Sequence, residues 1–338
     1  MRILFVLLFS IQANAYFNAN EVGQSVSKKD IDVKIAKKWF DHYYAKGSED
    51  FQSAFERGDQ YKKSIELVLK RYQVPVDFYY LAMTESYFNN HARSHKEAVG
   101  LWQFIPSTAE NYGLIVSEQI DERRHPIKST IAAAKYLRDL HNIFQDWTLA
   151  AAAYNCGEYR VLRAIKKGGT RSFAKLAEMK LLPDETINYV SKFWVTREID
   201  AKIRKKSSMV SMDRYLDSGT ITIKSLGTKL ETLSLISELS VDEIISYNPG
   251  ITKKMSSFPI NFNLYLPRVN ANLYSSFIRQ NGVVSKVTKP EALHLWGIKD
   301  SVKGDDIKIT FISPQQIKIK NMRTKEETII NKRELSKI

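Results

Sequence analysis

Apolar residues recur at helical spacing along most of the first two thirds of the chain. The run at residues 30–46 shows the pattern, and it is repeated at residues 61–72 and 129–141. Residues 147–157 form an alanine-rich segment that ends at a glycine. Because such spacing gives each helix one apolar face, the pattern predicts a mainly α-helical region with a shared core.

One of the predicted helices carries a carboxylate on its apolar face. Phe78, Leu81 and Ala82 lie at helical spacing with Glu85, and the two asparagines at residues 89–90 predict the end of the helix. A glutamate on an apolar face loses hydration, which raises its pKa and favours the protonated form. This is the property of a general acid, although a glutamate that reaches solvent from the rim of a buried face has the same pattern.

The pattern changes after residue 215. Residues 221–223 alternate like a strand, residues 232–236 and 240–250 read as two helices with a turn, and residues 262–267 read as a closing strand. The order predicts a small β-α-α-β module. Farther on, residues 307–312 and 316–320 alternate and are expected to pair as a hairpin.

The first residues have the pattern of an export signal. A basic residue precedes the apolar run at residues 3–11, and Ala13-Asn14-Ala15 supplies small side chains at the positions that a signal peptidase reads. The run is too short to span a bilayer. We therefore expect residues 1–15 to be a cleaved signal peptide and the protein to be exported, to the periplasm or the cell envelope. A lipid anchor is not expected, since no cysteine lies near the cleavage site.

The net charge and the cysteine content limit the binding partners and the kinds of site that the chain is expected to have. The 338 residues carry 51 Lys and Arg against 37 Asp and Glu, a net charge of +14. The basic residues are spread along the chain without a nucleic-acid-binding motif, so we expect attraction to peptidoglycan or to anionic membrane surfaces rather than to nucleic acid. Cys156 is the single cysteine and excludes an internal disulfide; a packing role fits it better than a nucleophilic one. His91 and His95 have a metal-like spacing but no evident third ligand, so no metal or cofactor is predicted.

Several separate sequence blocks resemble a known family in the same order. They are Glu85-Ser86, residues 98–104 (AVGLWQF), residues 106–109 (PSTA), residues 153–157 (AYNCG) and residues 185–190 (ETINYV). Together they resemble the lytic transglycosylase signature of the soluble lytic transglycosylase and goose-type lysozyme superfamily. Within it the resemblance is to the membrane-bound lytic murein transglycosylase D group, and it covers residues 36–267. Cys156 departs from the family's alanine.

This resemblance implies a fold and a function. The expected fold is a mainly α lysozyme-like lobe of an α+β superfamily, followed by a small α+β module and a short β-rich tail. The implied reaction cleaves the β-1,4 bond between N-acetylmuramic acid and N-acetylglucosamine in peptidoglycan strands and leaves a 1,6-anhydro-muramic end. Glu85 would act first as acid and then as base. The implied substrate-binding residues are Ser94, Gln103, Tyr154, Asn155 and Tyr189.

The module after the lobe resembles a LysM peptidoglycan-binding module, but it departs from one at residues 224–229. Glycan binding and a purely structural role both remain open. The expected domains are a signal peptide at residues 1–15, an N-terminal helical region at 16–60, the catalytic lobe at 61–206, the LysM-like module at 215–267 and a tail of unassigned role at 273–338.

Two other functions compete with the implied one. A goose-type lysozyme-like hydrolase would add water to the product, and it would need a second carboxylate to activate that water. Glu97 and Glu110 lie near Glu85 in sequence, but neither belongs to a block that would aim it at the cleft. A non-catalytic cell-wall-binding protein would not need Glu85-Ser86 or residues 100–103.

Overall fold

The computed structural model describes residues 26, 30–43, 48–204, 213–225, 227–252, 255–281, 307–313, 316–321 and 327–331. The chain divides into two compact units, one of residues 1–116 and 123–213 and the other of residues 117–122 and 214–338. The predicted signal peptide lies outside the described residues. Within the described part of the chain, no helix combines the length and the apolar character needed to cross a membrane.

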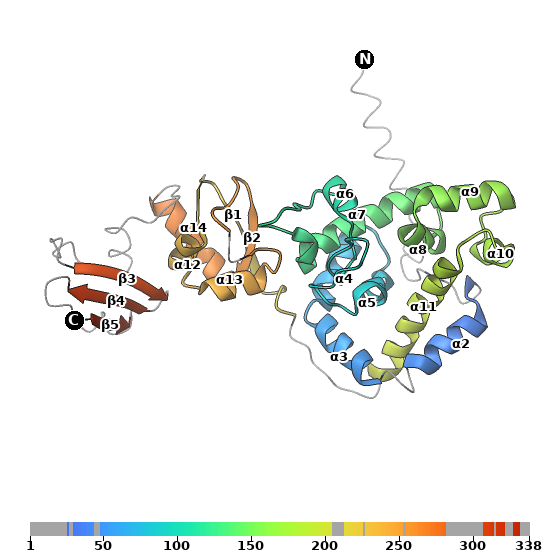
Figure 1. The fold of residues 1–338 in the computed structure, drawn as a ribbon, viewed down its shortest axis with the longest axis horizontal. Helices are drawn as coiled ribbons and strands as arrows, with labels where there is room; N and C mark the ends of the chain where they lie inside the picture. The colour runs from blue at the N-terminus through green and yellow to red at the C-terminus, as the bar shows by residue number, and fades with distance from the viewer. Residues whose placement is uncertain are drawn as a thin grey trace, which may run out of the picture. The chain divides into compact units, whose positions relative to one another are not determined.

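The first unit is built from helices (Figure 1). They are α2 (Val33–Asp41), α3 (Ser48–Asp59), α4 (Lys62–Arg71), α5 (Tyr79–Ser86), α6 (Pro106–Asn111), α7 (Pro126–Phe144), α8 (Trp147–Cys156), α9 (Glu158–Gly168), α10 (Phe173–Glu178) and α11 (Asp184–Arg204). The apolar periodicity predicts α2, α4, α5, α7 and α8, whereas α9 and α10 were not anticipated. A single 3-10 turn, Val76–Phe78, leads into α5.

Carboxylates fix the starts of three helices in this unit, α2, α4 and α8. Asp32 and Asp146 accept hydrogen bonds from the first backbone N–H groups of α2 and α8. The N-cap residue of α4 supplies no such bond. Instead Asp213, far along the chain, accepts from the backbone N–H of Ser64 at 2.7 Å and from its hydroxyl at 2.9 Å. Asp213 is therefore an integral part of the first unit.

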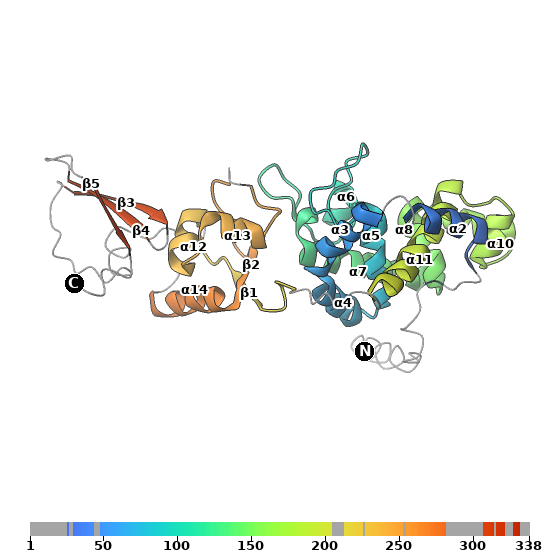
Figure 2. The same cartoon turned by 90° about the horizontal axis from the view of Figure 1, so that it is seen from below.

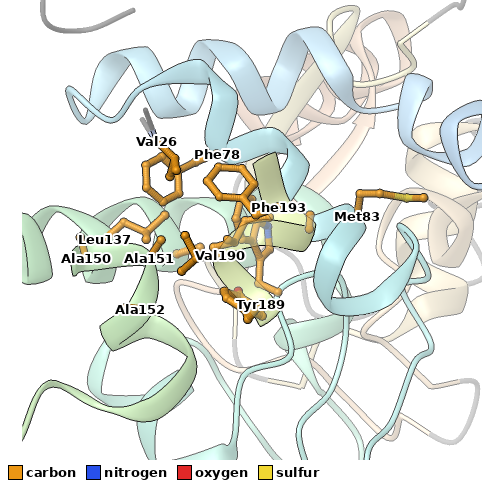
Figure 3. Packing of buried hydrophobic residues seen from close by; sticks show 14 of the residues in the cluster. Val26, Phe78, Met83, Leu137, Ala150, Ala151, Ala152, Tyr189, Val190 and Phe193 are labelled. Carbon is orange, nitrogen blue, oxygen red and sulfur yellow. The ribbon is translucent and has the colours of Figure 1, made fainter. Parts of the chain in front are cut away.

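The core of this unit lies where α8 packs between α7 and α11. Residues 150–153 of α8 are four buried alanines, whose small side chains let neighbouring helices approach closely. Figure 3 shows Ala150, Ala151 and Ala152 near Leu137 of α7 and Val190 of α11. Phe78, just ahead of α5, packs against Phe193 of α11 with the ring centroids 5.4 Å apart.

Two ionic contacts tie α11 to the segment that leads into α5. Arg197 of α11 pairs with Asp77 at 3.0 Å. Asp200, one turn farther along, is almost fully buried; it pairs with Lys62 at 3.1 Å and accepts a hydrogen bond from the hydroxyl of Tyr80 at 2.7 Å. Buried charges are tolerated only when they are paired in this way. These contacts fix the position of α11 relative to α5, and that relation shapes the site described below.

The second unit has the predicted β-α-α-β order. It comprises β1 (Ser218–Thr222), α12 (Leu230–Ser237), α13 (Val241–Tyr247), β2 (Asn263–Pro267) and α14 (Arg268–Asn281). The two strands pair antiparallel, with Ile221 opposite Leu264 and both side chains buried. The sequence analysis did not anticipate α14, which packs along β1 and also contacts α12 (Figures 1 and 2).

A short segment from earlier in the chain, residues 117–122, belongs to this second unit. Ile120 is buried in its core and forms an antiparallel bridge with Ile251. The backbone N–H of Asp121 donates to the carbonyl of Gly250 at 2.8 Å. A Cβ at residue 250 would lie 2.3 Å from the carbonyl oxygen of Asp121, so the close approach requires glycine there.

The tail contains a three-stranded antiparallel sheet in the order β3-β4-β5. The alternating residues 307–312 and 316–320 lie in β3 (Ile307–Ser313) and β4 (Gln316–Asn321), which pair with each other. The third strand, β5 (Glu327–Asn331), pairs with β4 and was not anticipated.

Candidate active site

Glu85 lies in the last turn of α5, on the face that the sequence predicts. Phe78, Leu81 and Ala82 are fully buried, while Glu85 itself is only partly covered. The helix ends earlier than the two asparagines at residues 89–90 suggest, because Tyr87 turns into the left-handed conformation with φ +54°. The next residue, Phe88, has φ +55°.

Two successive non-glycine residues in the left-handed region are costly, at about 1–2 kcal/mol each. Neighbouring contacts hold this turn in place. The hydroxyl of Ser86 donates to the carbonyl of Leu101 at 2.9 Å, which ties the end of α5 to the following loop. Arg57 of α3 donates to the carbonyl of Tyr87 at 3.1 Å. The backbone around Glu85 is thus fixed from both sides.

Tyr189 is the direct partner of Glu85. It lies on α11, is almost fully buried, and donates its hydroxyl to Oε1 of Glu85 at 2.5 Å. Burial and the nearby charge of Glu85 raise the pKa of Tyr189 well above its ordinary value. The phenol therefore stays protonated and remains a hydrogen-bond donor at all ordinary pH values. This contact joins two residues that the sequence analysis named separately.

The environment of Glu85 suits proton transfer near neutral pH. Burial raises the pKa of Glu85 to about 7, since the low-dielectric surroundings disfavour the carboxylate. The hydrogen bond from Tyr189 and the positive charge of Lys192 act in the opposite direction, and the negative charge of Glu185 adds to the rise. A carboxyl group with such a pKa can both give and take a proton at pH 7.

The loop after α5 is braced by its own polar side chains. The hydroxyl of Ser94 accepts from the backbone N–H groups of Lys96 and Ala98, at 3.2 and 3.1 Å. The side-chain amide of Gln103 donates to the carbonyl of Gly100 at 2.9 Å. Both predicted substrate-binding residues thus form hydrogen bonds within their own loop.

Gly100 and Arg123 hold this loop against the chain that follows α6. Gly100 has φ +85°, and a Cβ there would lie 1.9 Å from the carbonyl oxygen of Arg123, so no other residue fits. The guanidinium of Arg123 donates to the carbonyls of Glu97 at 2.8 Å and Phe104 at 3.0 Å. The loop is therefore anchored at its two ends by a single buried arginine.

Tyr154 and Asn155, at the end of α8, support the site from the other side. The hydroxyl of Tyr154 donates to the carbonyl of Trp102 at 2.7 Å, and the negative charge of Glu85 is among the causes that raise its pKa. The side-chain oxygen of Asn155 accepts from the hydroxyl of Thr186 at 2.9 Å. Burial raises the pKa of the neighbouring Cys156 thiol, which is the opposite of what a nucleophilic cysteine requires.

The sequence analysis missed two charged residues of this site. Glu185 and Lys192 both lie on α11, and both affect the pKa of Glu85. With Tyr189 they fall at residues i, i+4 and i+7, so helical spacing alone places them on one face. That periodicity was the signal that could have found them. The site thus brings together an acid, a hydroxyl donor, a cation and a second carboxylate.

Comparison with known protein families matches a stretch of the chain that includes Glu85 but ends before Tyr189. Residues 64–177 match the family described as the transglycosylase SLT domain. Over 198 residues the chain is 32% identical to membrane-bound lytic murein transglycosylase D of Escherichia coli, an alignment that covers 58% of this chain and 43% of that protein. It is 39% identical over 104 residues to the peptidoglycan transglycosylase of Escherichia phage T7, covering 29% of this chain and 8% of that protein.

Among solved structures, the chain is similar to an inactive mutant of lytic transglycosylase Slt from Pseudomonas aeruginosa. The two are 24% identical with a TM-score of 0.36, over 45% of this chain and 25% of that one. The chain spans less than half the length of each of these three transglycosylases.

Proposed function

We propose that this chain is a peptidoglycan lytic transglycosylase with Glu85 as its one acid and base, and the match of residues 64–177 to the transglycosylase SLT domain supports this proposal. The observation that carries the proposal is the state of Glu85: a partly buried carboxyl group, held by Tyr189 at 2.5 Å, with a pKa raised to about 7. Peptidoglycan is the substrate class that the names of the relatives support.

The proposed reaction uses one carboxyl group twice. Protonated Glu85 gives its proton to the glycosidic oxygen, and the bond between that oxygen and C1 of N-acetylmuramic acid breaks. The 6-hydroxyl oxygen of the same muramic residue bonds to C1, and the carboxylate of Glu85 takes its proton. The products are a 1,6-anhydro-muramic end and a free 4-hydroxyl on N-acetylglucosamine. Atoms balance without water, and Glu85 ends the cycle protonated.

The remaining site residues have proposed supporting roles. Tyr189 orients the carboxyl group of Glu85 through its hydrogen bond. Tyr154 holds the backbone of Trp102, next to Gln103, and Asn155 is held by Thr186. We expect Ser94 and Gln103 to contact the sugar while they keep the loop in shape, because each can still offer further hydrogen bonds.

A lysozyme-like hydrolase is the second candidate, and one observation favours it. Hydrolysis with inversion needs a second carboxylate beyond the first, with room for a water molecule between them. Glu97 does not meet this need, because it is exposed and pairs with Arg93. Glu185 does come close enough to raise the pKa of Glu85. Glu185 is therefore the residue through which a hydrolase would work.

Analysis of the products separates the two candidates. Purified sacculi digested with the protein should release fragments that end in 1,6-anhydro-muramic acid, measured by mass spectrometry. Fragments that end in reducing muramic acid would support the hydrolase instead. The absence of any released fragment from intact, folded protein would favour a protein that binds the wall without cutting it.

The second unit is proposed to add affinity for glycan rather than chemistry. Its β-α-α-β order, with the Ser240–Glu243 capping box at the start of α13, is compatible with a LysM-like module. We also propose that the protein acts in the cell envelope, where a net charge of +14 would attract it to the wall or to anionic membrane surfaces.

Removal of residues 214–338, which leaves residues 117–122 of the second unit in place, should weaken retention on the wall and leave the cutting of soluble strands nearly intact. The shortened chain must end after Asp213, because this carboxylate caps α4. Cosedimentation with sacculi measures retention, and product release from soluble strands measures cutting. If the shortened chain sediments as fully as the whole protein, the module has a structural role and does not bind glycan.

A further inference from the structure

Lys192 holds the end of the helix that carries Glu85. It lies one turn after Tyr189 on α11, so both side chains project from the same face. Its Nζ donates to the backbone carbonyl of Thr84 at 3.1 Å. Thr84 precedes Glu85 in the last turn of α5, where carbonyls lack partners within the helix. The ammonium group therefore satisfies one of these carbonyls, at the negative end of the helix dipole.

Two aromatic rings fix the position of this ammonium group. Nζ of Lys192 lies 5.3 Å from the ring centroid of Trp39, on α2, and 5.2 Å from that of Tyr87. Both distances suit an attraction between a cation and the face of a ring. Tyr87 is also the left-handed residue that ends α5. Lys192 thus joins α2, α11 and the end of α5 at one point.

The charged and titratable groups around Glu85 show how the position of Lys192 affects the ionisation of Glu85. From α11, Glu185, Tyr189 and Lys192 face it, and from α8 Tyr154 does. The positive charge of Lys192 acts against the rise that burial gives the pKa of Glu85. Burial lowers the pKa of Lys192, and the negative charge of Glu85 opposes that fall. Without this cation, burial and Glu185 would both oppose the ionised form of Glu85.

We propose that Lys192 is a positioning residue that stabilises the carboxylate of Glu85 at the moment when its proton has left for the glycosidic oxygen. The proposal rests on the proposed function. Lys192 neither gives nor takes a proton; its ammonium group stays clamped between the two rings and the Thr84 carbonyl. Without Lys192, the hydrogen bond from Tyr189 alone would offset the effects of burial and of the negative charge of Glu185 on the carboxylate that forms. By limiting the rise in the pKa of Glu85, Lys192 makes this carboxyl group a stronger acid towards the glycosidic oxygen. The same group can still take a proton back from the 6-hydroxyl.

The test compares Lys192→Met with Lys192→Arg. Methionine keeps much of the length of the side chain but removes the charge, while arginine keeps the charge. In Lys192→Met the pKa of Glu85 should rise, so the alkaline limb of the kcat/KM profile should move up by roughly 1 pH unit. The rate at low pH should also fall. Lys192→Arg should restore most of the original midpoint.

Lys62, the first residue of α4, offers a matched control. Its Nζ lies 4.9 and 5.5 Å from the rings of Tyr79 and Tyr80, but its ionic partner is Asp200. Lys62→Met should lower the melting temperature without moving the pH midpoint. A Lys192→Met protein that loses activity equally at every pH would show that Lys192 is only structural, and the proposal would fall.

A second readout does not depend on activity. The carboxyl carbon of Glu85, labelled with carbon-13, can be titrated by NMR in the wild-type protein and in Lys192→Met. A rise in its midpoint is expected, and an unchanged midpoint contradicts the proposal. Because this titration needs no turnover, it tests Lys192 even if product analysis shows that the proposed function is wrong.

Discussion

Replacing Glu85 by Gln is expected to abolish strand cleavage, with a rate loss of at least ~10³-fold. Glutamine keeps the size of the side chain and can still accept the hydrogen bond from Tyr189. It cannot donate a proton to the leaving oxygen or take one from the 6-hydroxyl. General acid–base catalysis commonly contributes ~10²–10⁴ in rate, and here one group serves both steps. Release of fragments from soluble glycan strands measures the loss.

The variant should remain folded and should be more stable than the wild type at high pH. Raising the pKa of Glu85 from 4.5 to about 7 means that its ionisation opposes folding. The wild type therefore loses up to about 3 kcal/mol as the pH rises from 4.5 to 7, whereas glutamine does not ionise. The melting temperatures should agree at pH 4, diverge as the pH rises from 4.5 to 7, and stay apart above pH 7, with Glu85→Gln the higher. A lower melting temperature at pH 8 would contradict this account of the carboxyl group.

Three other carboxylates serve as controls for the same experiment. Glu97→Gln and Glu110→Gln remove exposed groups and should change the rate little. Glu185→Gln is the decisive control, because Glu185 is the charge that raises the pKa of Glu85. Its replacement should lower that pKa and move the alkaline limb down in pH without silencing the enzyme. A loss as complete as that of Glu85→Gln would identify Glu185 as the base of a hydrolase.

Replacing Tyr189 by Phe should cost about 10- to 100-fold in kcat. The change removes one hydrogen bond to a group that becomes charged, and such bonds contribute ~1.5–3 kcal/mol. Because the bond from Tyr189 lowers the pKa of Glu85, its loss should also move the alkaline limb of the pH profile upward. The measurement is kcat and kcat/KM from pH 5 to 9.

Tyr154→Phe is the matched comparison for this variant. The hydroxyl of Tyr154 donates to the carbonyl of Trp102 rather than to Glu85. Its loss should loosen the loop and weaken substrate binding, with a smaller change in the pH midpoint. If Tyr189→Phe and Tyr154→Phe behave alike, the hydrogen bond between Tyr189 and Glu85 has no special role in catalysis.

The sequence predicted the structure best where apolar residues at helical spacing share a face with a residue of distinct chemistry. The helix bearing Glu85 could be predicted from Phe78, Leu81 and Ala82, which share its face. The residue at which this helix ends could not be predicted. Tyr87 and Phe88 are not residues that favour the left-handed conformation, and they adopt it because contacts with Arg57, Leu101 and Lys192 hold the turn. Such contacts join residues far apart in the sequence.

The sequence blocks that resemble the family predicted which residues belong to the site. They did not predict the contacts of each side chain. Ser94 and Gln103 engage their own loop, a result of backbone geometry that sequence spacing does not reveal. Lys192 and Glu185 could have been found, because they share a helical face with Tyr189. The helix α14 could also have been predicted, because Ala271, Tyr274 and Phe277 recur every three residues. All three are buried in the structure.

The central claim is that Glu85 works without an activated water molecule. The direct test is a digest of purified sacculi by the wild-type protein in water enriched in oxygen-18, followed by mass spectrometry of the released fragments. We predict muramic ends that are 1,6-anhydro and carry no oxygen-18, because the attacking oxygen is the sugar's own. Reducing muramic ends that carry oxygen-18 would show that water attacks C1, and would contradict the account.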